Sequence, residues 1–201
     1  MNSDMIAFIE LGFRHITDAA ALDHILFLLA LAAIYRPRDW RQALGVVTAF
    51  TVGHSLSLAL AVNGTVSFPT RWVEFLIPLT IVVTCVENIV VSRSGNTPWR
   101  RRYRPLFSGV FGLVHGAGFA NYLRDVFADR IALPLLGFNI GIELGQVVVL
   151  AFAALGIAGI DYAWAALRRG GAASSFRVRV MVVSSVILVV ATRWAVERNP
   201  W

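Results

Sequence analysis

Long apolar runs, separated by short polar gaps, constrain this chain more than any other feature of its sequence. A helix needs about 20 mostly apolar residues to cross the hydrocarbon core of a bilayer, where no water is present to bind the backbone. The runs show no strand-like alternation, so they predict helices. We expect about six membrane spans, at residues 22–35, 42–62, 72–91, 105–123, 131–157 and 178–196.

The composition agrees with a membrane protein, because 57% of the residues are hydrophobic and only 15% are charged. A soluble domain is nearer to half apolar and a quarter charged. The expected fold class is therefore all-α, a polytopic transmembrane helix bundle that forms a single domain over residues 1–201. Residues 5–13 are too short and too acidic to span, so they are predicted to form an interfacial or re-entrant helix within an N-terminal segment of residues 1–20, and a seventh, partial span stays open. Residues 22–196 would form the bundle.

Arginine supplies all 18 basic residues, and most of them lie in the gaps between apolar runs. The net charge of +6 also suits nucleic-acid binding. However, arginines in short loops between spans follow the positive-inside rule of membrane proteins. Three arginines follow the first predicted span, five follow the third and four follow the fifth, with fewer in the alternate gaps. We therefore expect these gaps in the cytoplasm, both termini outside, and no nucleic-acid partner.

Ionisable side chains inside the predicted spans mark the functional region. His24, His54 and His115 lie within a span or at its mouth, and so do Asp23 and Glu143. A charged side chain at the centre of a bilayer costs about 2.5–3.5 kcal/mol on insertion scales, which makes such residues functional candidates by default. At about 1.5 Å of rise per residue, these groups are predicted to share one layer in the outer half of the membrane.

Imidazole and carboxylate groups together predict a site for a divalent transition metal such as Ni, Co or Zn, since hard ions take oxygen ligands alone. The single cysteine, Cys85, provides no thiolate site. The candidate metal ligands are His15, His24, His54, His115, Asp23 and Glu143. The side chains expected to orient the imidazoles are Asn139, Gln146 and Ser55. Near the cytoplasmic end of the third span, an exit station for the ion is predicted at Glu87 and Asn88.

Two further stripes follow from helical spacing. Thr80, Thr84 and Glu87 form a polar stripe on the third predicted span. A stripe of small residues on the fifth span is predicted to let another helix pack closely, and it consists of Gly137, Gly141 and Gly145.

Five segments carry these polar residues in a recognisable order. They read GFRHITDAAALDHILFLLAL (12–31), FTVGHSLSLALAVNG (50–64), VENIVV (86–91), FGLVHGAGFA (111–120) and FNIGIELGQVVVL (138–150). Together they resemble the HupE/UreJ family, nickel/cobalt permease-like proteins of bacterial membranes. The resemblance implies a multi-pass permease in the bacterial inner (plasma) membrane, surrounded by lipid. It leaves open a homo-oligomer or a partner system for metalloenzyme maturation. The positions it implies as functional are His15, Asp23, His24, His54, Glu87, Asn88, His115, Asn139 and Glu143.

The first segment departs from the family pattern, which reads close to H-x-x-x-G-x-D-H. Here seven residues separate His15 from Asp23, and no glycine lies between them. In a continuous helix, the two extra residues would rotate His15 by about 200°. Asp18 is the residue that could substitute for it.

Three functions remain open at this point. A permease would take up ions at the outer end and release them past Glu87. An intramembrane zinc-dependent hydrolase would use the same cluster, with Ser55 or Glu143 as nucleophile or base. In a structural or assembly subunit, the polar residues would only join helices. Glu87 on the far side favours the permease, because a hydrolase needs no path through the membrane.

Overall fold

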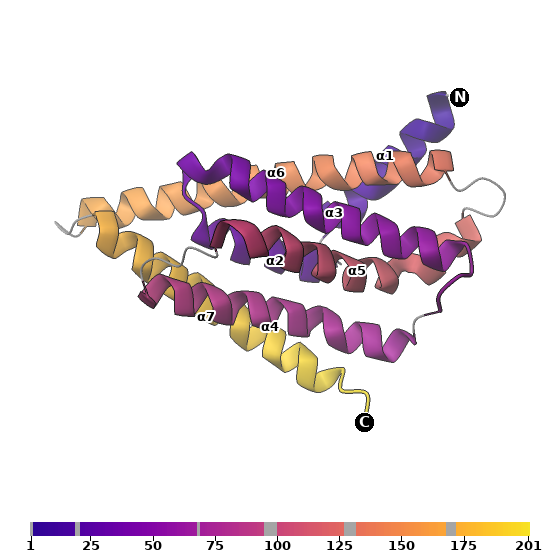
Figure 1. Ribbon diagram of the computed structural model, residues 1–201. Helices are drawn as coiled ribbons and strands as arrows, with labels where there is room; N and C mark the ends of the chain where they lie inside the picture. Colours follow the sequence, from indigo (N-terminus) through magenta and orange to yellow (C-terminus); the bar gives the residue numbers. More distant parts are fainter. Residues whose placement is uncertain (1, 19–20, 68, 95–99, 127–131, 168–171) are drawn as a thin grey trace.

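The computed structural model describes all residues except 1, 19–20, 68, 95–99, 127–131 and 168–171. Among the described residues, every regular element is a helix (Figure 1). The all-α prediction is therefore confirmed, and each of the six predicted spans falls on one of the helices α2 to α7. The elements are α1 (Asn2–Thr17), α2 (Leu22–Ile34), the 3₁₀ turn η2 (Pro37–Asp39), α3 (Trp40–Val62), α4 (Thr70–Ser94), α5 (Arg100–Val126), α6 (Ala132–Leu167) and α7 (Ala172–Glu197).

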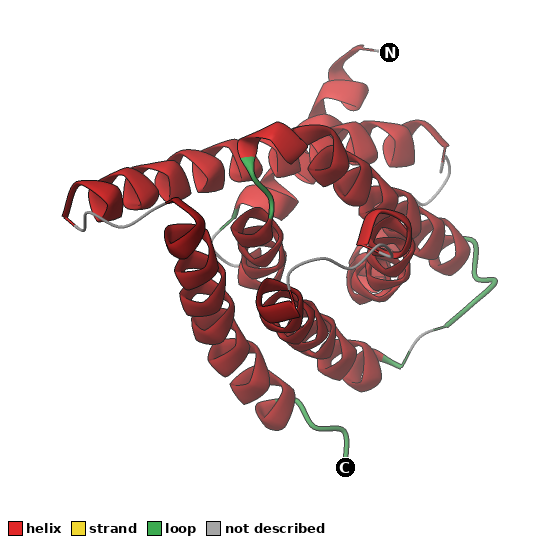
Figure 2. Cartoon of the chain, turned by 60° about the vertical axis from the view of Figure 1, so that its left-hand side comes forward, coloured by secondary structure: helices red, strands yellow, loops and turns green. Residues whose placement is uncertain are grey.

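The helices run alongside one another, and successive helices from α3 to α7 alternate in direction (Figure 1). Both termini lie toward the same end, which we call the terminal end. At the opposite end α2 meets α3, α4 meets α5 and α6 meets α7, and we call it the arginine-rich end. Turned by 60°, the helices are seen closer to end-on and gather in one bundle (Figure 2).

Four described helical segments are long and apolar enough to cross a bilayer alone, namely Trp40–Val62, Thr70–Arg93, Ala132–Trp164 and Phe176–Glu197. Asp4–Thr17 and Leu22–Ile34 form a pair bent by 69°, which passes the same test as one broken or re-entrant span. α5 has 27 residues but begins with several arginines, which lower its hydropathy. The chain is thus a multi-pass membrane protein, while six spans and outward termini stay predictions.

The side chains are arranged as expected for lipid surroundings. Large apolar residues are exposed on the outward faces, including Val52 (62%), Phe152 (71%) and Val189 (69%). Polar residues such as His54 and Gln146 are buried instead. Polar groups within membrane spans face the bundle interior because lipid offers them no hydrogen bonds. The interior of this bundle is therefore where its polar chemistry lies.

α3 and α5 pack backbone to backbone at glycine positions. A Cβ atom on Gly53 would collide with a carbonyl oxygen of α5, and one on Gly112 would collide with the carbonyl oxygen of Phe50. Small residues permit such close approach between membrane helices. This contact holds His54, next to Gly53, against the part of α5 that carries His115.

α1 packs in the same way along α6. A Cβ atom on Gly12 would collide with the carbonyl oxygen of Phe138, and one on Gly141 with that of Ile9. The predicted glycine stripe of α6 is therefore a packing surface, and α1 is the helix that occupies it. This places His15, near the end of α1, inside the bundle. The interfacial position of residues 1–20 remains a prediction.

Candidate metal centre

The four histidines of the chain come together, each from a different helix. His15 lies on α1, His24 on α2, His54 on α3 and His115 on α5. The ring centroid of His24 is 4.9 Å from that of His15, 6.0 Å from that of His54 and 5.1 Å from that of His115. The rings of His15 and His54 are 5.8 Å apart. We call these four residues the histidine cluster.

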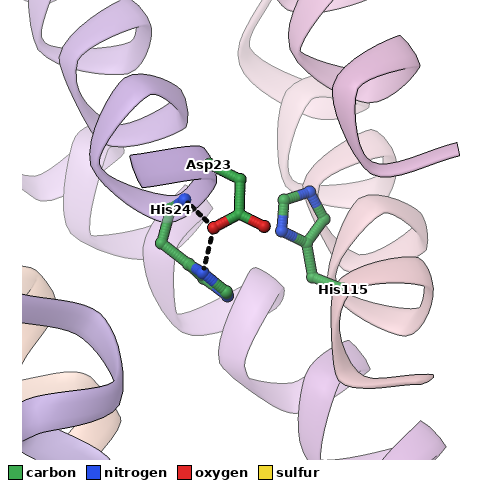
Figure 3. A group of neighbouring side chains, drawn as sticks. All are labelled: Asp23, His24 and His115. Carbon is green, nitrogen blue, oxygen red and sulfur yellow. Dashed lines mark hydrogen bonds and ion pairs between the residues drawn. The ribbon is translucent and has the colours of Figure 1, made fainter. Parts of the chain in front are cut away.

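Asp23 adds a carboxylate to the cluster (Figure 3). Its Oδ1 accepts hydrogen bonds from the backbone N–H of His24 at 2.9 Å and from Nδ1 of the same residue at 3.0 Å. The ring of His115 faces the Asp23 carboxylate from α5. One candidate ligand atom from each of Asp23, His24 and His115 lies within 4.8 Å of the other two, which is close enough for all three to hold one metal ion.

The ring nitrogens of the cluster are mostly unpaired. Among the described residues, five of them are buried without a hydrogen-bond partner: Nε2 of His15, Nε2 of His24, Nδ1 and Nε2 of His54, and Nδ1 of His115. A buried polar atom without a partner costs about 1–3 kcal/mol. A divalent transition-metal ion binds neutral imidazole through the lone pair of a ring nitrogen. Each histidine offers at least one unpaired nitrogen, so the residues present fit such an ion.

Aromatic rings surround the histidines. Phe50 contacts the rings of His24, His54 and His115 at centroid distances of 6.1, 6.0 and 5.1 Å. On the other side, Phe119 lies 4.1 Å from the ring of His15. These rings limit how the imidazoles can turn. Apolar surroundings also strengthen the interaction of a bound cation with its ligands.

An open cavity of about 500 Å³ leads to the cluster from the terminal end. His54 is fully buried and does not line it. Three carboxylates and two arginines line this opening, and an excess of negative charge attracts cations from solution. The ionisable residues that line the cavity are Arg14, His15, Asp18, Asp23, His24, Glu74, His115 and Arg198.

Thr80, which was predicted only as a member of a polar stripe, makes a polar contact with the histidine cluster. Thr80 of α4 is buried, with its Oγ1 3.0 Å from Nε2 of His115 and 2.7 Å from the carbonyl oxygen of Ile77. The stripe that was read from the sequence therefore contacts the cluster at its first member. Helical spacing in the sequence identifies the stripe, but it does not identify His115 as the residue that Thr80 contacts.

The polar residues of α6 differ in whether their side chains are paired. Oδ1 of Asn139 and Oε1 of Glu143 are buried without a partner among the described residues. Like His15 and His54, Glu143 is outside the group of ligand atoms that Asp23, His24 and His115 form. Oε1 of Gln146 accepts a hydrogen bond from Thr51 at 2.9 Å and so joins α6 to α3.

Ser55 follows His54 on α3, and its hydroxyl donates to the carbonyl oxygen of Thr51 at 2.6 Å. The single hydrogen of this hydroxyl therefore takes part in a hydrogen bond within α3.

The predicted exit residues lie toward the arginine-rich end and pair with Arg104 of α5. Arg104 forms an ion pair with Glu87 and donates a hydrogen bond to Oδ1 of Asn88 at 3.1 Å. Tyr103 donates to Oε1 of Glu87 at 2.6 Å, and the Asn88 amide donates to the carbonyl oxygen of Ala30 at 2.7 Å. We call Glu87, Asn88, Tyr103 and Arg104 the arginine cluster. From the sequence, Arg104 is only one of the five arginines that follow the third predicted span.

His15 lies in the histidine cluster despite its departure from the family spacing. The rotation of about 200° applies only to a continuous helix. Here α1 ends at Thr17, α2 begins at Leu22, and the two axes differ by 69°. The break allows His15 to approach His24 from a different helix.

Comparison with known proteins gives one match that covers nearly the whole chain. A family model described as "HupE / UreJ protein" matches residues 1–198. A curated protein, queuine tRNA-ribosyltransferase of Streptococcus pyogenes serotype M6, is 35% identical over 68 residues. That stretch is 34% of this chain and 17% of the transferase, so it shows no family. No solved structure matches the chain significantly.

Proposed function

This chain belongs to the HupE/UreJ protein family, and we propose that it is a permease for a divalent transition-metal ion of the nickel/cobalt type. The observation that supports this most is the set of buried, unpaired ring nitrogens contributed by four helices. A site shared between helices changes when those helices move, which is how transporters alternate access. Residues that served only to join helices would instead be expected to pair with one another.

The donor atoms favour a transition-metal ion over a hard cation. Up to four imidazoles and the carboxylate of Asp23 suit nickel, cobalt or zinc, whereas calcium and magnesium take oxygen ligands. We propose nickel or cobalt first because of the family, and zinc is the other ion that this donor set suits.

We propose that the ion enters through the open cavity at the terminal end. Carboxylates around the opening would attract it, and the buried imidazoles would then replace part of its water shell. Glu143 and Asn139 would provide further oxygens beside the site from α6. By the positive-inside rule, this end faces outward across the inner membrane of a bacterium.

The route onward is closed by two successive barriers. The ring of Phe27 stacks on that of Phe50 with 5.0 Å between the centroids, and its centroid is 6.1 Å from that of His115. Phe27 also lines a cavity of about 140 Å³ that reaches Glu87 and Arg104. We propose that release requires the phenylalanine rings to separate and Arg104 to leave Glu87. The ion would then reach the cytoplasm, where a metalloenzyme-maturation system is a suitable acceptor.

The zinc-dependent hydrolase has less support. A serine nucleophile needs a base that takes its proton, yet the hydroxyl hydrogen of Ser55 is donated to the carbonyl oxygen of Thr51.

Transport is tested with purified protein in liposomes that contain a fluorescent metal indicator. We expect saturable uptake of Ni²⁺ or Co²⁺ by the wild type and loss of uptake in His24→Ala. Gly45→Ala is the control, because a Cβ atom at that position meets no atom within 4 Å. Metal that binds tightly and is never taken up would contradict the permease and favour a fixed cofactor.

A further inference from the structure

Thr80 is a buried hydroxyl that contacts a ring of the histidine cluster from outside the set of candidate ligands. It lies on α4, which contributes no histidine, and its side chain is part of the bundle interior. Its Oγ1 is 2.7 Å from the carbonyl oxygen of Ile77 and 3.0 Å from Nε2 of His115. Both distances are those of hydrogen bonds.

Counting hydrogens fixes the direction of these two bonds. A threonine hydroxyl has one hydrogen to donate and two lone pairs that accept. The carbonyl oxygen of Ile77 can only accept, so the hydrogen of Thr80 lies between those two oxygens. Towards His115, Thr80 can then only accept. Nε2 of His115 must therefore carry the hydrogen, and in a neutral imidazole Nδ1 is left with the lone pair.

The surroundings of Nδ1 agree with this assignment. Nδ1 of His115 is buried and has no hydrogen-bond partner among the described residues. The ring faces the carboxylate of Asp23 (Figure 3). Nδ1 makes no hydrogen bond to that carboxylate, as expected for a nitrogen that carries no hydrogen, and a cation between the two would have both as ligands.

The same reasoning applies to His24. The carboxylate of Asp23 only accepts, so Nδ1 of His24 donates to it at 3.0 Å. Nε2 of His24 then carries the lone pair, and it is also buried without a partner. A carboxylate that orients a metal-binding imidazole in this way is a common second contact in metal sites.

We propose that Thr80 is a positioning residue that fixes the tautomer of His115, so that His115 binds the metal ion through Nδ1 while His24 binds it through Nε2. The role of the ion rests on the proposed function, whereas the tautomer itself does not. Loss of a residue that orients a ligand typically lowers metal affinity about 10–100-fold. Thr80 therefore influences metal binding without touching the metal.

The tautomer is tested in the metal-free protein by NMR after labelling the histidines with ¹⁵N. The His115 resonances are assigned by their loss in His115→Asn. We expect a hydrogen on Nε2 and none on Nδ1 in the wild type. Thr80→Val keeps the shape and removes the acceptor, so this preference should disappear, and Thr80→Ser should restore it. A hydrogen on Nδ1 in the wild type would overturn the proposal, since that nitrogen would then donate to Asp23.

Titration with Co²⁺ tests the consequence for binding. We expect Thr80→Val to weaken binding by about 10-fold or more, and Thr80→Ser to bind like the wild type. Thr84→Val is the matched control, because Thr84 lies one turn further along α4 and donates to the carbonyl oxygen of Thr80. Equal affinity in Thr80→Val and the wild type would overturn the role of Thr80. The predicted tautomer without any metal binding would contradict the proposed function alone.

Discussion

Two polar clusters are buried in the same bundle, and they differ in whether their atoms are paired. In the arginine cluster, Glu87, Asn88, Tyr103 and Arg104 form hydrogen bonds and an ion pair with one another. In the histidine cluster, every ring has at least one buried nitrogen without a partner among the described residues. Paired polar groups stabilise a fold, whereas unpaired ones reduce its stability until a ligand binds. The two clusters are therefore expected to respond in opposite ways to substitution.

The largest expected change in stability follows from Arg104→Leu. Removing Arg104 leaves the carboxylate of Glu87 without its charge partner, which costs about 3–5 kcal/mol for a buried pair. Glu87 is partly exposed (26%), so we expect the lower end of that range. Unfolding in detergent measures the loss, and the metal affinity should remain unchanged.

The double variant Arg104→Leu/Glu87→Leu is the control for this prediction. It removes both charges, so most of the lost stability should return. If Arg104→Leu reduces the magnitude of the free energy of metal binding by as much as it lowers the free energy of unfolding, the two clusters are not separate in function.

His54→Leu should show the opposite pattern. It should weaken metal binding by more than the roughly 10–100-fold that an orienting residue contributes. Stability without metal should not fall, because both ring nitrogens of His54 are unpaired in the fold. Calorimetric titration and unfolding of the same preparation measure both effects. A large loss of stability with unchanged metal affinity would assign His54 to packing alone.

Gly53→Ala tests the backbone contact that brings His54 and His115 together. The added Cβ atom collides with a carbonyl oxygen of α5, and overpacking of this kind typically costs about 1–3 kcal/mol. We expect lower stability and weaker metal binding together. Gly45→Ala on the same helix should change neither, because its Cβ atom meets nothing within 4 Å. Equal behaviour of the two variants would refute this packing argument.

The smallest effect is expected for Glu143→Gln. The ring of His54 lies 5.8 and 6.0 Å from the rings of His15 and His24, whereas among the described residues Glu143 is not part of the ligand group of Asp23, His24 and His115 and has no such ring contact. Its loss should therefore weaken metal binding by less than the roughly 10-fold of an orienting residue. Titration with Ni²⁺ checks this value. A loss as large as that in His54→Leu would make Glu143 a direct ligand.

The sequence predicted the helices because hydropathy is a local property, whereas the depth of the polar residues in the membrane stays a prediction. Rise per residue placed His24, His54 and His115 in one layer but did not show that their helices meet; in the structure the rings of His54 and His115 both lie near that of His24. The position of His15 beside the other histidines could not be derived from the sequence, since the break between α1 and α2 decides the direction from which His15 approaches them. The sequence also offered no way to predict the partners of Thr80 and Arg104, because those partners lie on other helices. Only the packing of α4 against α5 identifies His115 and Glu87 as those partners.

The central claim is that the histidine cluster binds a transition-metal ion. The most direct test is the metal content of purified protein loaded with Ni²⁺, measured by mass spectrometry for the wild type, His54→Leu and His115→Leu. We predict near-stoichiometric nickel in the wild type and its loss in both variants. Wild-type protein without bound nickel, or equal nickel in all three proteins, would contradict the claim.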